Sequence, residues 1–395
     1  MPTVKNEINM SGKFLFCTAF AVAVCGLVVT ACSAIAGPKN GARHTHNWGG
    51  WTQTAYPRTD ERVCKTDPSH KEIRLTGIGR FSFEPIGSAD GGTSYRVCKC
   101  AETRDEVRIP AFYRPDADRD FLPVTEIGGG AFAHCNNLTG VILPDGVTTI
   151  GSNAFNGCTV LVTVTFAQGS RLESIGDRAF DDAGLTGITI PAGVTSIGER
   201  AFAFCESLTS ITIPASVTSI GEGAFVSCRR LTGITVDPDN PMYASEGGIL
   251  YNKAKTALLA FPSASGNITI PAGVTSIGDN VFYGFTGLTG VTIPVNVTTI
   301  GVQAFILCTS LATVTFAAGS QLQTIGYRAF SNCIRLTSIA IPARVTSVGG
   351  AAFFGWTNAQ TISVEGYANQ TSADAAWGKG WRNQCHAKIR YSGRQ

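Results

Sequence analysis

Charged residues are scarce in this sequence, and their scarcity argues against several classes of protein. Only 15% of the 395 residues are Asp, Glu, Lys or Arg, and the formal net charge is +3. A disordered chain carries more charge and fewer apolar residues, whereas 44% of this chain is hydrophobic. No stripe of Lys or Arg recurs along the chain, so we expect no nucleic-acid partner.

Catalytic motifs are also missing. The sequence contains no GxSxG, HExxH or P-loop pattern, and no His, Asp and Ser set recurs with a common spacing. Histidine is rare: His44 and His46 lie in a Gly- and Asn-rich stretch, and His134 has no periodic partner. We therefore expect no enzyme activity and no cofactor. A catalytic site confined to residues 47–120 is the alternative.

Metal-binding spacings are absent as well. Cys64, His70, Cys98 and Cys100 could supply four zinc ligands, but the paired CxxC elements of structural zinc sites are lacking. The acidic run at residues 116–120 lacks the glycine and the closing glutamate of a calcium loop. We expect no metal site, and these cysteines, together with Cys385, are left as disulfides or free thiols.

One long apolar run occurs, at residues 14–31, after Lys5 and Lys13. Its position and the small residues that follow favour a secretory signal over a membrane span, so residues 1–31 are predicted to be a signal peptide. The sequence VTAC predicts Cys32 as a lipidated amino terminus, followed by a tether over residues 32–50. Cleavage before Gly37 or an uncleaved anchor are the alternatives. An exported protein is expected in each cleaved case, at the cell surface or outer membrane, or else secreted or periplasmic.

The abundant feature is a repeat. The segment VTSIGERAFAFCESLTSITIPAS, which begins at Val194, returns with small changes at Val217 and at Val274. One phenylalanine marks each copy, at Phe132, Phe155, Phe180, Phe202, Phe225, Phe282, Phe305, Phe330 and Phe353. Their spacing is 22 to 25 residues, except for one step of 57 that equals a unit of 23 plus an insertion of 34. A fixed period of this length predicts a solenoid, here of nine units over residues 124–367.

Each unit contains two periodicities. In LTSITIP, Leu208, Ile211 and Ile213 are apolar between small polar residues, which predicts a short strand with one buried face. Ile197, Ala201 and Cys205 fall four residues apart, which is typical of one face of a short helix. The predicted fold class is therefore an α/β solenoid in which strand stacks on strand and phenylalanine on phenylalanine.

The pattern LTxIxIPxxVTxIGxxAFxxC resembles that of the BspA-like, or Treponema-type, leucine-rich repeat family of bacterial surface proteins. The resemblance implies parallel strands on a concave face, short helices on a convex face and adhesion to host matrix proteins or to other cells. One departure is that Gly146, Gly193, Ser216, Gly273, Asn296 or Arg344 stands where other leucine-rich repeats have asparagine.

The remaining segments are predicted to flank or interrupt the stack. Residues 51–123 are predicted to form a β module that caps the first unit. A β-hairpin is expected near residues 237–266, projecting from the solenoid. Residues 368–395 are predicted to form a second cap, with a helix that has Thr371 or Ser372 as its N-cap and buries Trp377 and Trp381.

One repeat position is mostly cysteine. It holds Cys135, Cys158, Cys205, Cys228, Cys308 and Cys333, whereas Ala183, Phe285 and Trp356 occupy it in the other units. This interchange favours an apolar packing role over disulfides between neighbouring units.

The candidate binding surface is the outward face of the strands, which the period covers with small hydroxyl side chains. Its residues are Thr163, Thr165, Thr186, Thr189, Thr209, Ser210, Thr212, Thr232, Thr235, Thr289, Thr292, Thr313 and Thr315. Threonine is also simply a good solvent-tolerant strand former. We expect this face to bind extracellular proteins; the alternative is a structural envelope protein without a specific ligand.

Overall fold

The computed structural model describes residues 52–53, 59–63, 71–75, 80–86, 93–101, 105–113, 122–262 and 264–393. The chain divides into two compact units, residues 1–74 and residues 75–395. In the first part of the chain, β1 runs antiparallel to β2 in a three-stranded sheet with β3. Its strands are β1 (Thr52–Gln53), β2 (Thr59–Val63) and β3 (Lys71–Leu75).

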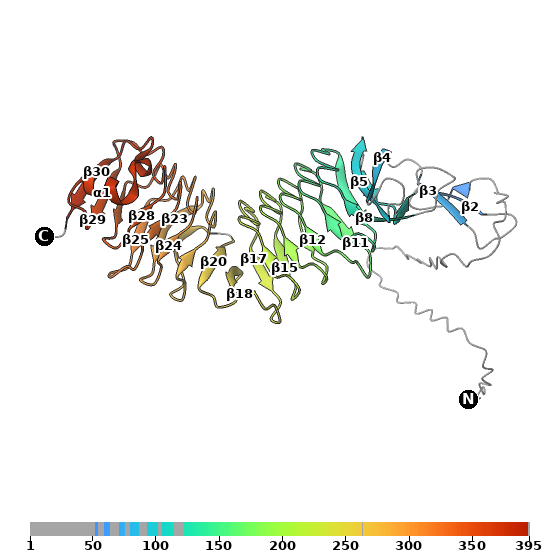
Figure 1. The fold of residues 1–395 in the computed structure, drawn as a ribbon, viewed down its shortest axis with the longest axis horizontal. Coiled ribbons are helices and arrows are strands. Elements are labelled where there is room, and N and C mark those ends of the chain that lie inside the picture. The colour runs from blue at the N-terminus through green and yellow to red at the C-terminus, as the bar shows by residue number, and fades with distance from the viewer. Residues whose placement is uncertain are drawn as a thin grey trace, which may run out of the picture. The chain divides into compact units, whose positions relative to one another are not determined.

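The second unit is a β-solenoid whose turns each contribute one longer strand to a row that we call the long-strand row (Figure 1). The row consists of four three-stranded sheets, which makes twelve strands among the described residues. They are β6 (Asp105–Arg108), β9 (Leu138–Leu143) and β11 (Thr163–Phe166); β13 (Ile188–Thr189), β15 (Ser210–Ile213) and β17 (Gly233–Val236); β21 (Gly266–Thr269), β23 (Leu288–Ile293) and β25 (Thr313–Phe316); and β27 (Ser338–Ile341), β29 (Thr361–Glu365) and β30 (Lys388–Ser392).

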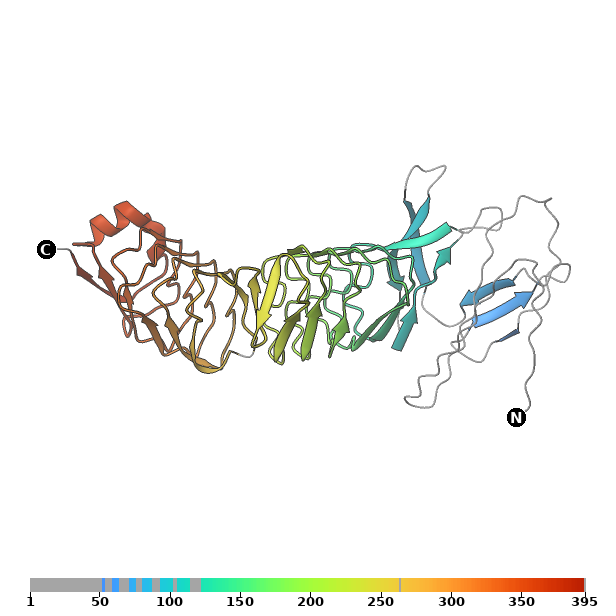
Figure 2. The same ribbon diagram turned by 90° about the horizontal axis from the view of Figure 1, so that it is seen from below.

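A second row, the short-strand row, runs along another side of the stack (Figure 2). Its first sheet contains β4 (Arg80–Ile86), β5 (Ser94–Ala101), β7 (Phe112–Tyr113), β8 (Leu122–Ile127), β10 (Thr149–Ile150), β12 (Ser174–Ile175), β14 (Ser196–Ile197) and β16 (Ser219–Ile220). Its second sheet contains β18 (Tyr243–Glu246), β19 (Ile249–Asn252), β20 (Ala257–Ala260), β22 (Ser276–Ile277), β24 (Thr299–Ile300), β26 (Thr324–Ile325) and β28 (Ser347–Val348).

Alternating side chains determine which face of each long strand is buried. In β15, Ile211 and Ile213 are buried while Ser210 and Thr212 are exposed. The neighbouring strand β17 pairs with it in parallel, so that Ile211 lies opposite Ile234. The predicted strands are therefore present, and each isoleucine or valine packs on its equivalent in the next turn.

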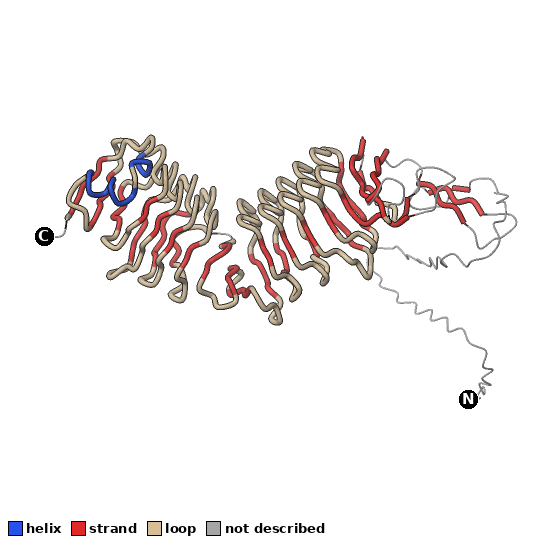
Figure 3. The backbone as a smooth tube through the Cα atoms, viewed as in Figure 1, coloured by secondary structure: helices blue, strands red, loops and turns tan. Residues whose placement is uncertain are grey.

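The predicted convex helices are wrong. In the turn around Phe155, alternate backbone N–H groups donate in different directions: Ala154 donates to Gly151 O within the turn, whereas Phe155 donates to Ala179 O of the next turn. A helix would direct every N–H along its own segment. Two residues of this turn, Asn153 (φ 58°) and Gly157 (φ 68°), have left-handed backbone conformations that interrupt any helix. Helix appears in the described residues only near the carboxyl end (Figure 3).

The solenoid has more turns than the nine predicted units, because three long strands lack a phenylalanine of the repeat. These strands are β6, β21 and β30. β6 pairs with β9, β21 with β23, and β30 with β29, each in parallel. The phenylalanine count therefore missed one turn at each end and one within the insertion.

A ladder of stacked phenylalanine rings forms the centre of the core. Phe155 and Phe180 stack with centroids 5.2 Å apart and planes inclined by 2°, and Phe305 and Phe330 repeat this geometry. Stacking of this kind adds to the burial of apolar area. The core is nevertheless two clusters rather than one, because the buried residues divide between Leu250 and Tyr251.

The carboxyl-terminal residues pack against the last turn of the repeat. Helix α1 (Gln370–Trp377) has Asn369 as its N-cap, whose side chain accepts a hydrogen bond from Ser372 N, so the predicted N-caps Thr371 and Ser372 are wrong. The 3-10 helix η1 (Lys379–Arg382) follows, and Trp381 is fully buried. Backbone N–H groups of Ala351 and Gly355 donate to Gly380 O and Gln384 O.

Candidate functional site

The predicted hydroxyl residues lie on the outward side of the long-strand row. All are exposed except Thr292, which is half-buried. They belong to β11, β13, β15, β17, β23 and β25, or lie one or two residues before one of these strands. Because inward residues of the same strands fill the core, the outward positions form a face that is polar and almost free of charge.

Strand register places several hydroxyl groups in columns. Thr189 lies opposite Thr212, and Thr212 lies opposite Thr235. In the second half of the stack, Thr292 lies opposite Thr315. Adjacent strands are about 4.8 Å apart, so each column presents hydroxyl groups at that interval.

The threonines of a neighbouring column, which includes Thr209 and Thr232, donate hydrogen bonds between turns. The Thr209 hydroxyl donates to Thr186 O at 3.1 Å, and the Thr232 hydroxyl donates to Thr209 O at 3.0 Å. Thr289 similarly donates to the side-chain oxygen of Asn267 at 3.0 Å. These hydrogen bonds join one turn to the next, so the hydroxyl groups of this column already have partners within the protein.

The hydroxyl face is interrupted by the insertion. β17 ends one sheet and β21 begins another. The glycine turn between β18 and β19 lies beside β17, where Ile234 N donates to Gly248 O at 2.9 Å. The face therefore consists of two hydroxyl patches, a first patch on β11 to β17 and a second patch on β23 and β25.

A row of acidic residues follows the short-strand row. Asp177, Glu199, Glu222 and Asp279 occupy one repeat position in successive copies. Two of them have structural partners, because the Asp177 carboxylate accepts Glu199 N at 2.8 Å and the Asp279 carboxylate accepts Val302 N at 2.6 Å. The negative charge of Asp279 raises the pKa of Glu222, with burial as the second cause. The row shows no acid–base pair with a nucleophile.

Five of the six residues of the cysteine column are buried thiols that also donate hydrogen bonds, whereas Cys135 is half-buried, so the prediction of a fully buried column is wrong at that position. The described structure places Cys158, Cys205, Cys228, Cys308 and Cys333 in the core without disulfides, as the packing interpretation predicted. Each thiol donates to the carbonyl oxygen of the repeat phenylalanine one turn earlier, at 2.9–3.1 Å. Trp356, in the same position, uses its indole N–H for the same bond to Phe330 O. A shared donor group in Cys and Trp was the sequence signal for this role.

These thiols are expected to be inert in the native protein. Burial raises the pKa of Cys158, Cys228 and Cys308 to about 12. At pH 8 roughly one thiol in 10⁴ is then ionised, and only the thiolate is nucleophilic. We expect iodoacetamide to leave the five buried cysteines unmodified at pH 8 and to modify all five in denaturant without reductant. Modification of the native column, or missing thiols in the unreduced denatured chain, would contradict this prediction.

Several other candidates lie outside the described residues. Cys32, His44, His46, Cys64, His70 and the acidic run at residues 116–120 belong to this group, as do the apolar run at 14–31 and the side chain of Cys100. Cys98 is half-buried, and its thiol lies 3.7 Å from Arg96 O. Among the described residues, no group of three or more His, Cys, Asp and Glu could hold a metal ion. None of the helices in this part of the chain has the length and apolar character needed to span a bilayer.

Comparison with known proteins identifies the repeat. The BspA type leucine-rich repeat region matches in six copies over residues 125–242 and 261–375. A leucine-rich repeat protein from Eubacterium ventriosum is 26% identical with a TM-score of 0.53, over 70% of this chain and 83% of that one. The pneumococcal vaccine antigen PcpA has the same TM-score at 18% identity, over 81% of this chain and 100% of that one.

A leucine rich cell surface protein from Faecalibacterium prausnitzii is 28% identical, over 80% of this chain and 94% of that one, with a TM-score of 0.48. No curated protein matches the chain. The repeat profile covers more than half of the sequence, at the positions where the described structure forms stacked turns. The chain belongs to the BspA-type leucine-rich repeat proteins.

Proposed function

We propose that this protein is displayed on a bacterial cell surface and binds macromolecules through its two hydroxyl patches. The observation that supports the proposal most directly is the register of Thr189, Thr212 and Thr235, which places exposed hydroxyl groups in one column across three turns. An exposed surface of regular hydrogen-bonding groups, free of charge, suits a broad docking contact with another protein. Membership of a non-enzymatic repeat family supports binding over catalysis.

The partner class that we propose is extracellular protein, either host matrix protein or a protein of another bacterial surface. Charge contributes little to such a contact, so binding is expected to depend weakly on ionic strength. A structural envelope role remains the second candidate. We also infer that β4 to β8 and the segment from α1 to β30 cap the two ends of the solenoid, because the latter supplies acceptors to the last repeat turn.

Export and anchoring belong to the same proposal. Residues 1–31 would direct secretion, and Cys32 would carry the lipid. Labelling with a palmitate analogue in the native host is expected to mark the protein and to disappear in a Cys32→Ala variant. Unchanged labelling of that variant, or a mature chain that starts at Gly37, would contradict lipidation.

The binding proposal is tested by adding charge to one column. We expect a variant with Thr189→Lys, Thr212→Lys and Thr235→Lys to lose most retention on immobilised fibronectin, fibrinogen or partner cells. Binding of the partner would remove water from three lysine ammonium groups without giving them partners of opposite charge. Retention of the full exported chain is measured at low and high salt.

The matched control places the same three charges on the short-strand side, as Thr195→Lys, Thr218→Lys and Thr346→Lys. These threonines are also exposed, and each donates its hydroxyl to a carbonyl of the preceding turn. Equal retention of both variants would show that the hydroxyl patches do not form the contact. No retention of the parent chain on any of these surfaces would favour the structural role.

A further inference from the structure

The turn that the insertion adds has a strand in each of the two rows, but between these strands it lacks the longer segment that carries the repeat phenylalanine in other turns. β20 joins the short-strand row through its pairing with β22, and β21 joins the long-strand row through its pairing with β23. Only residues 261–265 connect β20 to β21, whereas residues 278–287 connect the equivalent strands β22 and β23. The two strand rows therefore contain one more layer than the side of the stack formed by the segments that carry the repeat phenylalanine, which we call the turn side.

On the turn side, the two flanking turns meet directly but do not form their usual hydrogen bonds. The Ser227 hydroxyl donates to Tyr283 O at 3.2 Å, and Phe204 contacts Tyr283 edge to face at 6.0 Å. In the preceding turn, the backbone N–H groups of Phe202 and Phe204 donate to Ala224 O and Val226 O.

The equivalent donors at the insertion are the backbone N–H groups of Gly223, Phe225 and Ser227. Within the described residues, none of these three groups has a backbone acceptor. The regular pattern would pair them with the carbonyl groups of Asp279, Val281 and Tyr283, which lie on the facing turn. We call this open junction, between residues 223–227 and 279–283, the seam.

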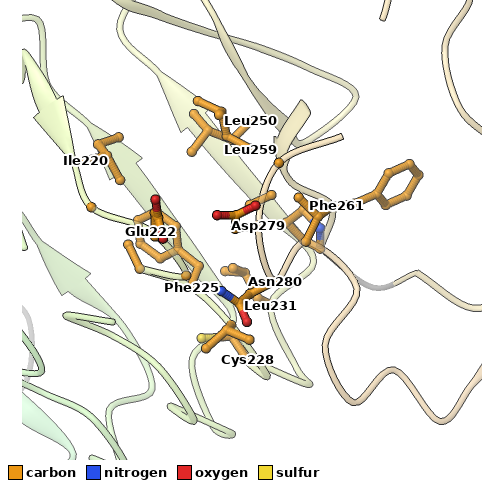
Figure 4. Close-up of a pocket in the computed structure, with 18 of the residues that line it drawn as sticks. Ile220, Glu222, Phe225, Cys228, Leu231, Leu250, Leu259, Phe261, Asp279 and Asn280 are labelled. Atoms are coloured by element: carbon orange, nitrogen blue, oxygen red, sulfur yellow. The ribbon is translucent and has the colours of Figure 1, made fainter. Parts of the chain in front are cut away.

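A cavity of about 110 Å³ lies at the seam (Figure 4). Phe225, Leu231, Leu250 and Leu259 are among its lining residues, and Phe261 directs its ring away from Phe225. The ladder of stacked rings stops here: Phe225 stacks on Phe202, and Phe282 contacts Phe261 at 5.5 Å, but Phe225 and Phe282 do not stack on each other. A cavity of this kind removes the packing that otherwise couples one turn to the next.

We infer that the seam is a hinge between two separately cooperative blocks, residues 80–236 and residues 264–393. Each block has its own hydrophobic cluster, its own ring ladder and its own sheets in both strand rows. In a solenoid, coupling between neighbours is what makes the stack unfold together, and at the seam three backbone hydrogen bonds and one ring contact are missing.

The β18–β19 hairpin is the strap that keeps the two blocks together. Asn240 is buried, and its side-chain amide donates to Pro214 O and Val217 O of the first block. The Tyr243 hydroxyl accepts Ile220 N at 2.8 Å. Because β19 also pairs with β20, and β20 pairs with β22 of the second block, the hairpin is bonded to both blocks while the seam opens and closes beside it. The prediction that the hairpin projects from the solenoid is therefore wrong, because the hairpin bridges the two blocks.

Hinge motion would change the angle between the two hydroxyl patches, since one patch belongs to each block. Like charges also face the opening, with Glu222 on the first block and Asp279 on the second (Figure 4). Opening the seam separates these carboxylates, and closing it would form the three missing hydrogen bonds. The inference concerns folding units and stands whether or not the hydroxyl patches bind a partner.

Two matched substitutions test the hinge in the full chain. Phe180→Leu perturbs the first block, and Phe305→Leu perturbs the second; both rings are fully buried between two stacked neighbours. Trp356, Trp377 and Trp381 all lie in the second block, so fluorescence reports that block once Trp48 and Trp51 are replaced by Phe. Circular dichroism reports both blocks.

We expect Phe305→Leu to lower the denaturant midpoint measured by fluorescence. Phe180→Leu is expected to leave that midpoint unchanged, and to make part of the circular dichroism signal change at a lower denaturant concentration. Coincident transitions that both substitutions shift equally would show one cooperative solenoid and overturn the hinge. Hydrogen exchange of the parent chain gives a second test. The Phe225 N–H should exchange orders of magnitude faster than the N–H of Phe202, and equal protection would overturn the open seam.

Discussion

A Phe202→Ala variant is expected to lose about 3–5 kcal/mol of unfolding free energy. The Phe202 ring is fully buried and stacks between Phe180, at 5.4 Å, and Phe225, at 5.9 Å. Alanine would leave a cavity that neighbouring turns cannot fill, because their spacing is set by strand pairing on two sides. Chemical denaturation followed by circular dichroism measures the loss.

Phe112 provides the control, since it is 44% exposed on β7. Phe112→Ala removes the same atoms from a partly solvated site and is expected to cost less than about 1 kcal/mol. A similar cost for both substitutions would mean that the ring ladder does not carry the stability assigned to it.

The second large effect is expected from Gly198→Ala, which should lower the free energy of unfolding by about 3 kcal/mol. A β-carbon at Gly198 would lie 2.5 Å from Asp177 N and from Gly176 C of the preceding turn. Backbone atoms cannot move aside as a flexible side chain could, so the two turns would have to separate. The equivalent glycines Gly176, Gly221, Gly301 and Gly326 face the same close approach.

Gly187→Ala is the matched control, because a β-carbon there would meet nothing within 4 Å. Gly187 lies on the exposed long-strand face, so this substitution is expected to be neutral to slightly stabilising. Thermal denaturation of both variants decides the point. If Gly198→Ala is as stable as Gly187→Ala, the turns are not packed as closely at this glycine column as the structure shows.

Sequence periodicity predicted the solenoid and the buried face of each long strand because both depend on local alternation. Ile211 and Ile213 could only face one way once Thr212 faced the other. The predicted helices failed for a physical reason. A spacing of four between Ile197, Ala201 and Cys205 suits a helix, but it also suits short turns whose alternate N–H groups bond to the next turn.

Some information on these turns was present in the sequence. Asn153 and Asn280, with Gly157 and Gly284, occupy the two left-handed positions of their turns. Asparagine and glycine favour that conformation, so their recurrence beside the phenylalanine argued against a helix. Arg200 and Phe204 adopt the same conformation although neither residue favours it, so the unit that contains Phe202 shows no Asn or Gly at these two positions.

The candidate site was predicted as a list of exposed hydroxyl groups, and twelve of its thirteen members are exposed. The sequence could not show that Thr209 and Thr232 use their hydroxyls between turns, because that depends on distances across the stack. It also could not show the seam. The insertion looked like an addition to a loop, and only strand pairing reveals that β20 and β21 form an additional layer.

Alternate backbone N–H groups around the repeat phenylalanines donate in one direction along the stack. Asn153, Phe155 and Gly157 donate to the following turn, and carbonyl groups of each turn accept from the preceding one. The dipoles of these peptide groups consequently add along the stack axis, and within each block one unit continues the same polarity as the unit before it. Units could therefore be gained or lost between the ends without changing what either end must provide. The final segment has no such freedom, because Gly380 and Gln384 must terminate the array of donors whatever its length.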